Sequence, residues 1–149
     1  MRGTALAEGI GEVLTPLSPM IKCPVLIAKP PVSVSTKLVY SGLKLDRDTV
    51  HPNIDELLKD IRFRNMKGIC RHMGNVLESV TVPLYPVIAE IKERMRAKGA
   101  RAALMSGSGP TVFGLFEDEG TARRALEDMR ISGLAKQIYL TSIYNNRRR

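Results

Sequence analysis

The feature that most constrains the fold is a pair of short apolar runs joined by a bare tip, ALMSGSGPTVFGLF, in the last third of the chain. Residues 102–105 and 111–116 have the length and β-branched content of strands. The tip between them consists almost wholly of small residues, which suits a tight turn. We therefore expect a β-hairpin here, followed by a helix over 121–129 and a strand over 137–143 with alternating apolar residues.

The rest of the chain predicts further strands and four helices ahead of this unit. Residues 23–28, CPVLIA, predict a buried strand, and the Gly-containing opening predicts an irregular strand pair or one curved strand. Apolar residues recur at helical spacing over 33–43, 51–61, 66–80 and 83–98. This order predicts an α+β fold in which helices pack on one face of an antiparallel sheet, of the split-βαβ (ferredoxin-like) type.

The length and composition indicate one domain and exclude several classes of protein. No linker or repeat divides the 149 residues, so we expect one domain over 1–149, with 1–30 as a strand-rich lead-in. No apolar run approaches the roughly 20 residues that cross a bilayer, so no membrane partner is expected. Cys23 and Cys70 are too few and too scattered for a disulfide framework or a zinc site. We expect a reducing, cytoplasmic setting.

The chain is basic, with a formal charge of +8. The basic residues are spread along the chain and do not alternate with aromatic ones, which make up 5% of the residues. A surface that stacks nucleic-acid bases needs such aromatics, so nucleic acid is not the favoured partner. The charge suits an anionic small molecule equally well, or a solvated basic surface.

The tip itself carries groups that bind anions. Gly107 and Gly109 permit positive φ and a close approach to the backbone. Backbone N–H groups in such a turn can converge on an anion, and Ser106, Ser108 and Thr111 add hydroxyls. No lysine follows as in a P-loop, and an ordinary hairpin turn explains the glycines without any ligand.

Three stretches together resemble one enzyme family. ALMSGSGPTVFGLF resembles the third signature motif of the GHMP small-molecule kinases. Residues 25–40, VLIAKPPVSVSTKLVY, and residues 3–17, GTALAEGIGEVLTPL, are similar to members that phosphorylate a cytidine-diphosphate-linked sugar alcohol. The resemblance extends from Gly3 to about Ile143, in the same order.

The resemblance implies transfer of the γ-phosphoryl group of ATP to the 2-hydroxyl of that sugar alcohol, in the non-mevalonate route to isoprenoids. ATP would be a co-substrate, with Mg²⁺, in a cleft between two halves. The sequence contains no Pro-Gly-Leu-Gly-Ser-Ser ATP loop. We therefore expect a GHMP kinase C-terminal domain without the N-terminal ATP-loop domain, with no catalytic residue, metal site or bound cofactor of its own. We expect it to be inactive alone and to self-associate through the face left by the absent half.

The resemblance also implies roles for particular residues. Thr36 corresponds to a substrate-side hydroxyl and Tyr40 to an aromatic residue that stacks on cytosine. The residues near the ATP phosphates would be Ser106, Gly107, Ser108, Gly109 and Thr111. From the residues alone, Thr36 could equally be a helix cap or a first-turn residue, and the pattern favours Tyr40 as a half-buried helix residue.

Two other functions remain open at this stage. One is a non-catalytic ferredoxin-like module that binds an anion at the tip, and the other is a basic RNA-binding domain. The two histidines suggest no catalysis: we expect His51 in a turn and His72 on a solvated helix surface.

Overall fold

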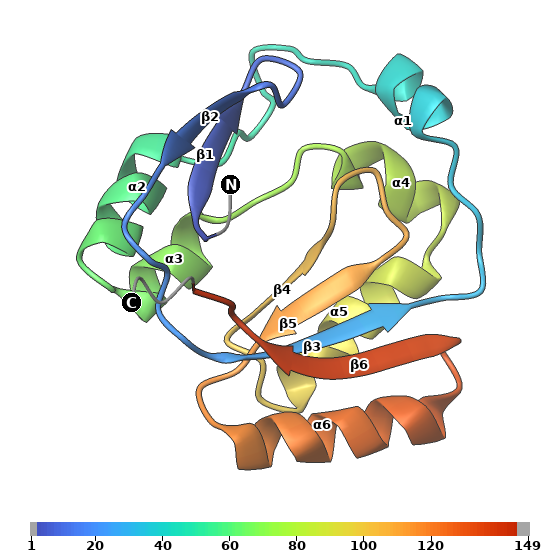
Figure 1. The fold of residues 1–149 in the computed structure, drawn as a ribbon. Coiled ribbons are helices and arrows are strands. Elements are labelled where there is room, and N and C mark those ends of the chain that lie inside the picture. The colour runs from blue at the N-terminus through green and yellow to red at the C-terminus, as the bar shows by residue number, and fades with distance from the viewer. Residues whose placement is uncertain (1–2, 146–149) are drawn as a thin grey trace.

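A computed structural model describes residues 3–145 (Figure 1). The strands are β1 (Ala5–Glu8), β2 (Val13–Pro16), β3 (Pro24–Lys29), β4 (Ala102–Met105), β5 (Val112–Leu115) and β6 (Gln137–Ser142). The helices are α1 (Thr36–Gly42), α2 (Ile54–Arg62), α3 (Met66–His72), α4 (Glu78–Leu84), α5 (Val87–Ala97) and α6 (Glu119–Ser132).

Four strands form an antiparallel sheet in the order β4-β5-β3-β6. Helices separate β3 from β4 along the chain, α6 separates β5 from β6, and β3 lies between β5 and β6, so this is the split-βαβ order that the sequence predicts. The pair β1–β2 forms a separate antiparallel hairpin, which Figure 1 shows above one end of the main sheet. The lead-in over 1–30 thus supplies both this hairpin and a central strand of the sheet.

Helices α5 and α6 cover one face of the sheet and form the main core with it. The α5 side chains Ile88, Ile91 and Met95 are fully buried. Against them lie Leu26 and Ala28 of β3. The α6 residues that are buried are the four that the spacing predicts: Ala122, Ala125, Leu126 and Met129.

The opposite face of the sheet is only partly covered. At one end Val25 and Leu115 pack with Met66 and Cys70 of α3 in a second, smaller apolar cluster. Beyond this cluster on the same face, paired residues of the four strands form a row across the sheet. From β4 to β6 the row consists of Leu104, Phe113, Ile27 and Tyr139. We call these four residues the open row.

Two expected helices are each divided in the structure, so the predictions over 66–80 and 83–98 are wrong in their boundaries. The first is interrupted because the chain leaves the helical conformation at Met73, whose ψ is 144°, and α4 begins only at Glu78. The second is interrupted at Tyr85, with φ −133° and ψ 76°, because Pro86 disfavours a helical conformation in the residue before it. Leu84, expected in the buried stripe, ends α4 and is 62% exposed.

The first two helices begin later than their apolar spacing predicts. Helix α1 is capped by Ser35, and α2 by Asn53, so Pro52 precedes the cap instead of occupying the first turn. In α1, Val39 is buried while Leu38, expected beside it in the buried stripe, is exposed. None of the helices within residues 3–145 is long and apolar enough to cross a membrane.

Candidate functional site

The tip between β4 and β5 is a tight turn on the protein surface. Its ends are joined by the Ser106 amide, which donates to the Thr111 carbonyl at 2.8 Å, and the Gly109 amide donates to the Ser106 carbonyl at 3.0 Å. Gly107 has φ 56° and Gly109 has φ 87°, which lie in the left-handed region that glycine permits. A side chain at 109 would also meet Met105 Sδ at 2.6 Å.

The structure brings the tip to the start of α1, although 72 residues separate them in sequence. Thr36 Oγ1 and Ser108 Oγ lie 2.9 Å apart in a hydrogen bond. The helix cap is Ser35, whose hydroxyl accepts from the Leu38 amide at 3.3 Å. The capping role that was open for Thr36 therefore belongs to its neighbour, and the Thr36 hydroxyl is directed to the tip.

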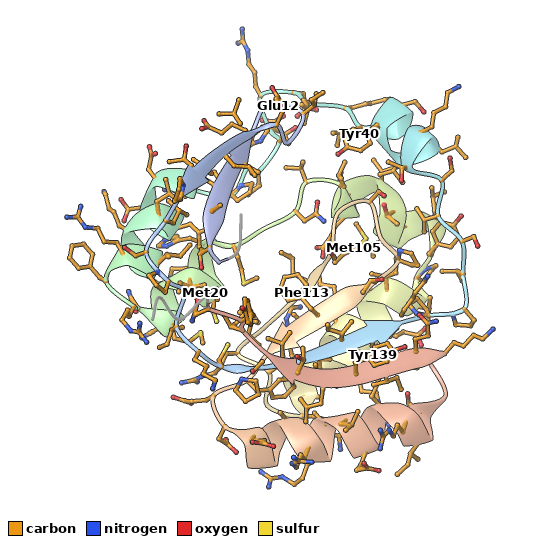
Figure 2. All side chains as sticks on the ribbon, viewed as in Figure 1. Glu12, Met20, Tyr40, Met105, Phe113 and Tyr139 are labelled. Atoms are coloured by element: carbon orange, nitrogen blue, oxygen red, sulfur yellow. The ribbon has the colours of Figure 1, made fainter. Side chains whose placement is uncertain are left out.

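Tyr40 lies one turn beyond Thr36 on α1, and its side chain is 61% exposed. Residues four apart share a helix face, so the exposed ring and the Thr36 hydroxyl belong to one side of α1. Figures 1 and 2 show α1 standing apart from the sheet, with the tip reaching up beside α4 toward it. The arrangement joins an exposed aromatic ring, hydroxyl groups and a backbone turn at one surface.

Side chains from the α3–α4 region hold the tip from behind, and the sequence analysis did not identify them. Asn75 Nδ2 donates to the carbonyl oxygens of Met105 and Gly107, at 2.9 and 2.7 Å. The buried Thr81 hydroxyl donates to the Ser108 carbonyl at 3.1 Å. Asn75 falls within the stretch predicted as one helix over 66–80, and Thr81 directly follows it. No local pattern there predicts a contact with a hairpin 27 to 32 residues away.

The site offers neutral donors and no cluster of acidic side chains. Hydroxyls and backbone N–H groups suit phosphate oxygens, whereas Mg²⁺ prefers carboxylate and water oxygens. Over residues 3–145 there is no group of three or more His, Cys, Asp or Glu side chains that could hold a metal ion. We therefore assign no metal ligand to the described residues.

The histidines lie away from this site. His51, expected in a turn, is exposed in an irregular segment. The expectation for His72 is wrong: its Nδ1 lies 2.6 Å from Asp60 Oδ2, and only 24% of the side chain is exposed. Asn65 Nδ2 donates to the other Asp60 oxygen at 2.8 Å. Because this pairing links α2 to α3, it gives His72 a structural role that the sequence did not reveal.

Comparison with known families supports the resemblance in sequence. The family described as GHMP kinases C terminal matches residues 57–134. The chain is 54% identical over 144 residues to a 4-diphosphocytidyl-2-C-methyl-D-erythritol kinase of Lachnospira eligens, covering 97% of this chain and 50% of that protein. The corresponding kinase of Geobacillus kaustophilus is 46% identical, with 97% and 49% covered. The chain thus spans about half the length of the curated relatives it matches.

Solved structures agree with this comparison. The crystal structure of a 4-(cytidine 5'-diphospho)-2C-methyl-D-erythritol kinase superposes with a TM-score of 0.75 at 32% identity, covering 95% of this chain and 50% of that one. A homoserine kinase from Cytophaga hutchinsonii gives a TM-score of 0.73 at 22% identity, with 94% and 47% covered, which shows a shared fold.

Proposed function

Because the chain belongs to the GHMP kinases and matches the C-terminal part of that family, we propose that it is the substrate-side domain of an ATP-dependent kinase. The substrate of this proposal is 4-diphosphocytidyl-2-C-methyl-D-erythritol, as in the names of its similar relatives. The reaction transfers the γ-phosphoryl group of ATP to the 2-hydroxyl, a step of isoprenoid synthesis that we assign to the cytoplasm.

The observation that carries the proposal is the hydrogen bond between Thr36 and Ser108, at 2.9 Å. It joins the helix proposed to bind the substrate to the turn proposed to lie beside the phosphates. In this arrangement Tyr40 stacks on the cytosine ring, since a flat base binds well to an exposed aromatic face. The Thr36 hydroxyl and the tip donors then meet the polar part of the substrate.

The described residues contribute binding and orientation to the reaction. Phosphoryl transfer depends mainly on holding the donor and the attacking oxygen in line and on stabilising charge at the phosphate. For the second task, Gly107 and Ser108 offer backbone N–H groups and Ser106, Ser108 and Thr111 offer hydroxyls, while Gly109 permits the tight turn. Thr36 and Tyr40 serve the first task. The tip has no carboxylate for Mg²⁺, so no step of the proposal passes through that ion.

Replacing Tyr40 with alanine tests the substrate side of the site. We expect Tyr40→Ala to weaken binding of cytidine 5'-diphosphate about tenfold, because the stacked base loses its partner. Binding of a non-hydrolysable ATP analogue, measured with the N-terminal half of a similar relative added, should change little. Titration calorimetry with both ligands measures this, and Tyr144→Ala, which removes a ring of similar exposure outside the site, is the matched control. Equal losses for both ligands would contradict the stacking role.

Turnover tests the assignment to a kinase. Residues 1–149 contain no ATP-loop motif, so we expect no phosphoryl transfer from ATP to the proposed substrate when they are assayed alone. Addition of the N-terminal half of a similar relative should give turnover that depends on Tyr40. Steady turnover by residues 1–149 alone would refute the expectation.

A further inference from the structure

The tip has two backbone donors that nothing in the described part of the protein uses. The Ser106 and Gly109 amides are occupied within the turn. For Gly107 and Ser108, no acceptor within residues 3–145 pairs with the backbone N–H. Both residues lie at the outer end of the turn, where Gly107 is exposed and Ser108 partly so. An exposed pair of consecutive N–H groups is a geometry that binds anions.

Asn75 determines where one of these N–H groups points. Its Nδ2 donates to the Gly107 carbonyl at 2.7 Å and to the Met105 carbonyl at 2.9 Å. In a trans peptide the C=O and the following N–H point in opposite directions. The Gly107 carbonyl is directed inward to Asn75, so the Ser108 N–H is directed away from Asn75.

Asn75 is itself held in one orientation. Its Oδ1 accepts from the Leu77 amide at 3.0 Å, which leaves the Nδ2 group facing the tip. The loop between α3 and α4, which interrupts the helix expected over 66–80, is what places this amide against the hairpin. In an uninterrupted helix, Asn75 would not lie in the loop from which its side chain reaches the hairpin.

Two further side chains secure the same segment. Thr81 is fully buried, and its hydroxyl donates to the Ser108 carbonyl at 3.1 Å. Glu78 Oε1 accepts from the Met105 amide at 2.8 Å, and its Oε2 pairs with Lys92 Nζ at 2.5 Å. The Met105 and Gly107 carbonyls accept from Asn75, and the Ser108 carbonyl accepts from Thr81. The peptide groups of the turn therefore cannot rotate without losing several hydrogen bonds.

We propose that Asn75, supported by Thr81, is a positioning residue that holds the Gly107 and Ser108 N–H groups as a preformed site for phosphate oxygens. The inference rests on the proposed function, because it names the groups with which that site binds a phosphate. Prior orientation matters because N–H groups that are already aligned need no rearrangement when the anion binds. The phosphate can come from the cytidine diphosphate or from ATP, which share this chemistry.

Substitution of Asn75 tests the inference by calorimetry with three ligands on the full chain. We expect Asn75→Ala to weaken binding of cytidine 5'-diphosphate about tenfold and to leave binding of cytidine, which has no phosphate, unchanged. The same titration with a non-hydrolysable ATP analogue shows which phosphate the site takes. In the unsubstituted protein, the Gly107 and Ser108 amide resonances should shift when the diphosphate binds.

Asn145→Ala is the matched control, because its Nδ2 also holds a backbone carbonyl, that of Met20, at 2.8 Å, but in another part of the fold. We expect it to leave the affinity for the diphosphate unchanged. A second pair guards against a variant that fails to fold. Thr81→Val removes the hydroxyl and should weaken diphosphate binding, whereas Thr81→Ser retains it and should preserve the affinity.

The outcomes separate the inference from the function on which it rests. If the unsubstituted chain binds neither cytidine diphosphate nor the ATP analogue even with the N-terminal half of a similar relative added, the proposed function fails and the inference with it. If the unsubstituted chain binds the diphosphate and Asn75→Ala or Thr81→Val binds it equally well, the inference alone is overturned. An equal loss for cytidine and cytidine diphosphate would show a general structural effect and would also overturn it.

Discussion

The two cysteines, Cys23 and Cys70, differ in how readily their thiols can react. Cys23 is 4% exposed, and its burial, together with the nearby Cys70, raises its pKa to about 11. Burial also raises the pKa of Cys70, although Arg101 opposes the shift. Because only the thiolate attacks an alkylating reagent, both are slow, but Cys70 is partly exposed and Cys23 is not.

We expect iodoacetamide at pH 8 to modify Cys70 well before Cys23 in the folded protein. At that pH a thiol with a pKa near 11 is ionised in about one molecule per thousand, and the reagent must also reach it. Mass spectrometry of the labelled peptides measures the two rates. In guanidinium chloride both rates should become similar and fast. Faster labelling of Cys23 in the native state would contradict the burial of its thiol.

Pairs of elements are joined by charges whose contribution depends on pH. Asp128 of α6 accepts from Arg94 Nε at 2.6 Å and from Arg94 Nη2 at 3.2 Å, and Lys98 Nζ lies 3.1 Å away. Arg94 belongs to α5 and Lys98 directly follows that helix, so the Asp128 carboxylate links α5 to α6. The Arg94 hydrogen bonds, opposed by partial desolvation and reinforced by Lys98, hold the pKa of Asp128 below its ordinary 3.8.

We expect Asp128→Asn to lower the free energy of unfolding by about 1 kcal/mol at pH 7, since the two-point ion pair is lost. The folded pKa of the wild-type carboxyl is lowered, so its contribution is present above 3.8 and disappears as the pH falls through the folded value. Urea unfolding at several pH values measures this. Glu127→Gln, which breaks a pair within α6 alone, is the control and should have a smaller effect. A difference that persists unchanged in acid would argue against the ion pair.

At the scale of the whole molecule, exposed apolar surface and positive charge have opposite effects on association between copies of the chain. The open row lies on the sheet face that α5 and α6 do not cover, and Tyr139 in it is 58% exposed. Exposed apolar surface of this kind favours association, while the formal charge of +8 keeps copies apart. The self-association expected from the sequence stays a prediction, with the open row as the surface involved.

We expect the sedimentation coefficient of the chain to rise with protein concentration, and to rise further in salt, which screens the repulsion. Tyr139→Lys should reduce this rise because it places a charge on the open row. Tyr144→Lys adds the same charge at a similarly exposed tyrosine outside the row and should have less effect. Identical sedimentation of the two variants would exclude the open row as the contact.

Much of the fold follows from periodicity along the chain. The predicted strand over 102–105 coincides with β4, and the apolar spacing of residues 121–129 identifies the buried side of α6. Local rules failed where a neighbour in space or a proline changed the backbone. Pro86 separates α4 from α5 at Tyr85, within the range expected as one helix over 83–98, and the α3–α4 loop formed where Asn75 bonds to the hairpin. Leu38 and Val39 show the same limit, since only packing decides which of them is buried.

By itself, the sequence determined which segments form the main sheet, the glycine tip and the family, because each of these is indicated by short stretches of neighbouring residues. Only the tertiary structure decided what surrounds the tip. The contacts with Thr36, Asn75 and Thr81 join residues 27 to 72 positions away, and no local preference encodes such distances. They arise because Val39 of α1 and Leu77, which precedes α4, pack into the main core and so bring their segments close to the hairpin, where its backbone carbonyls find partners.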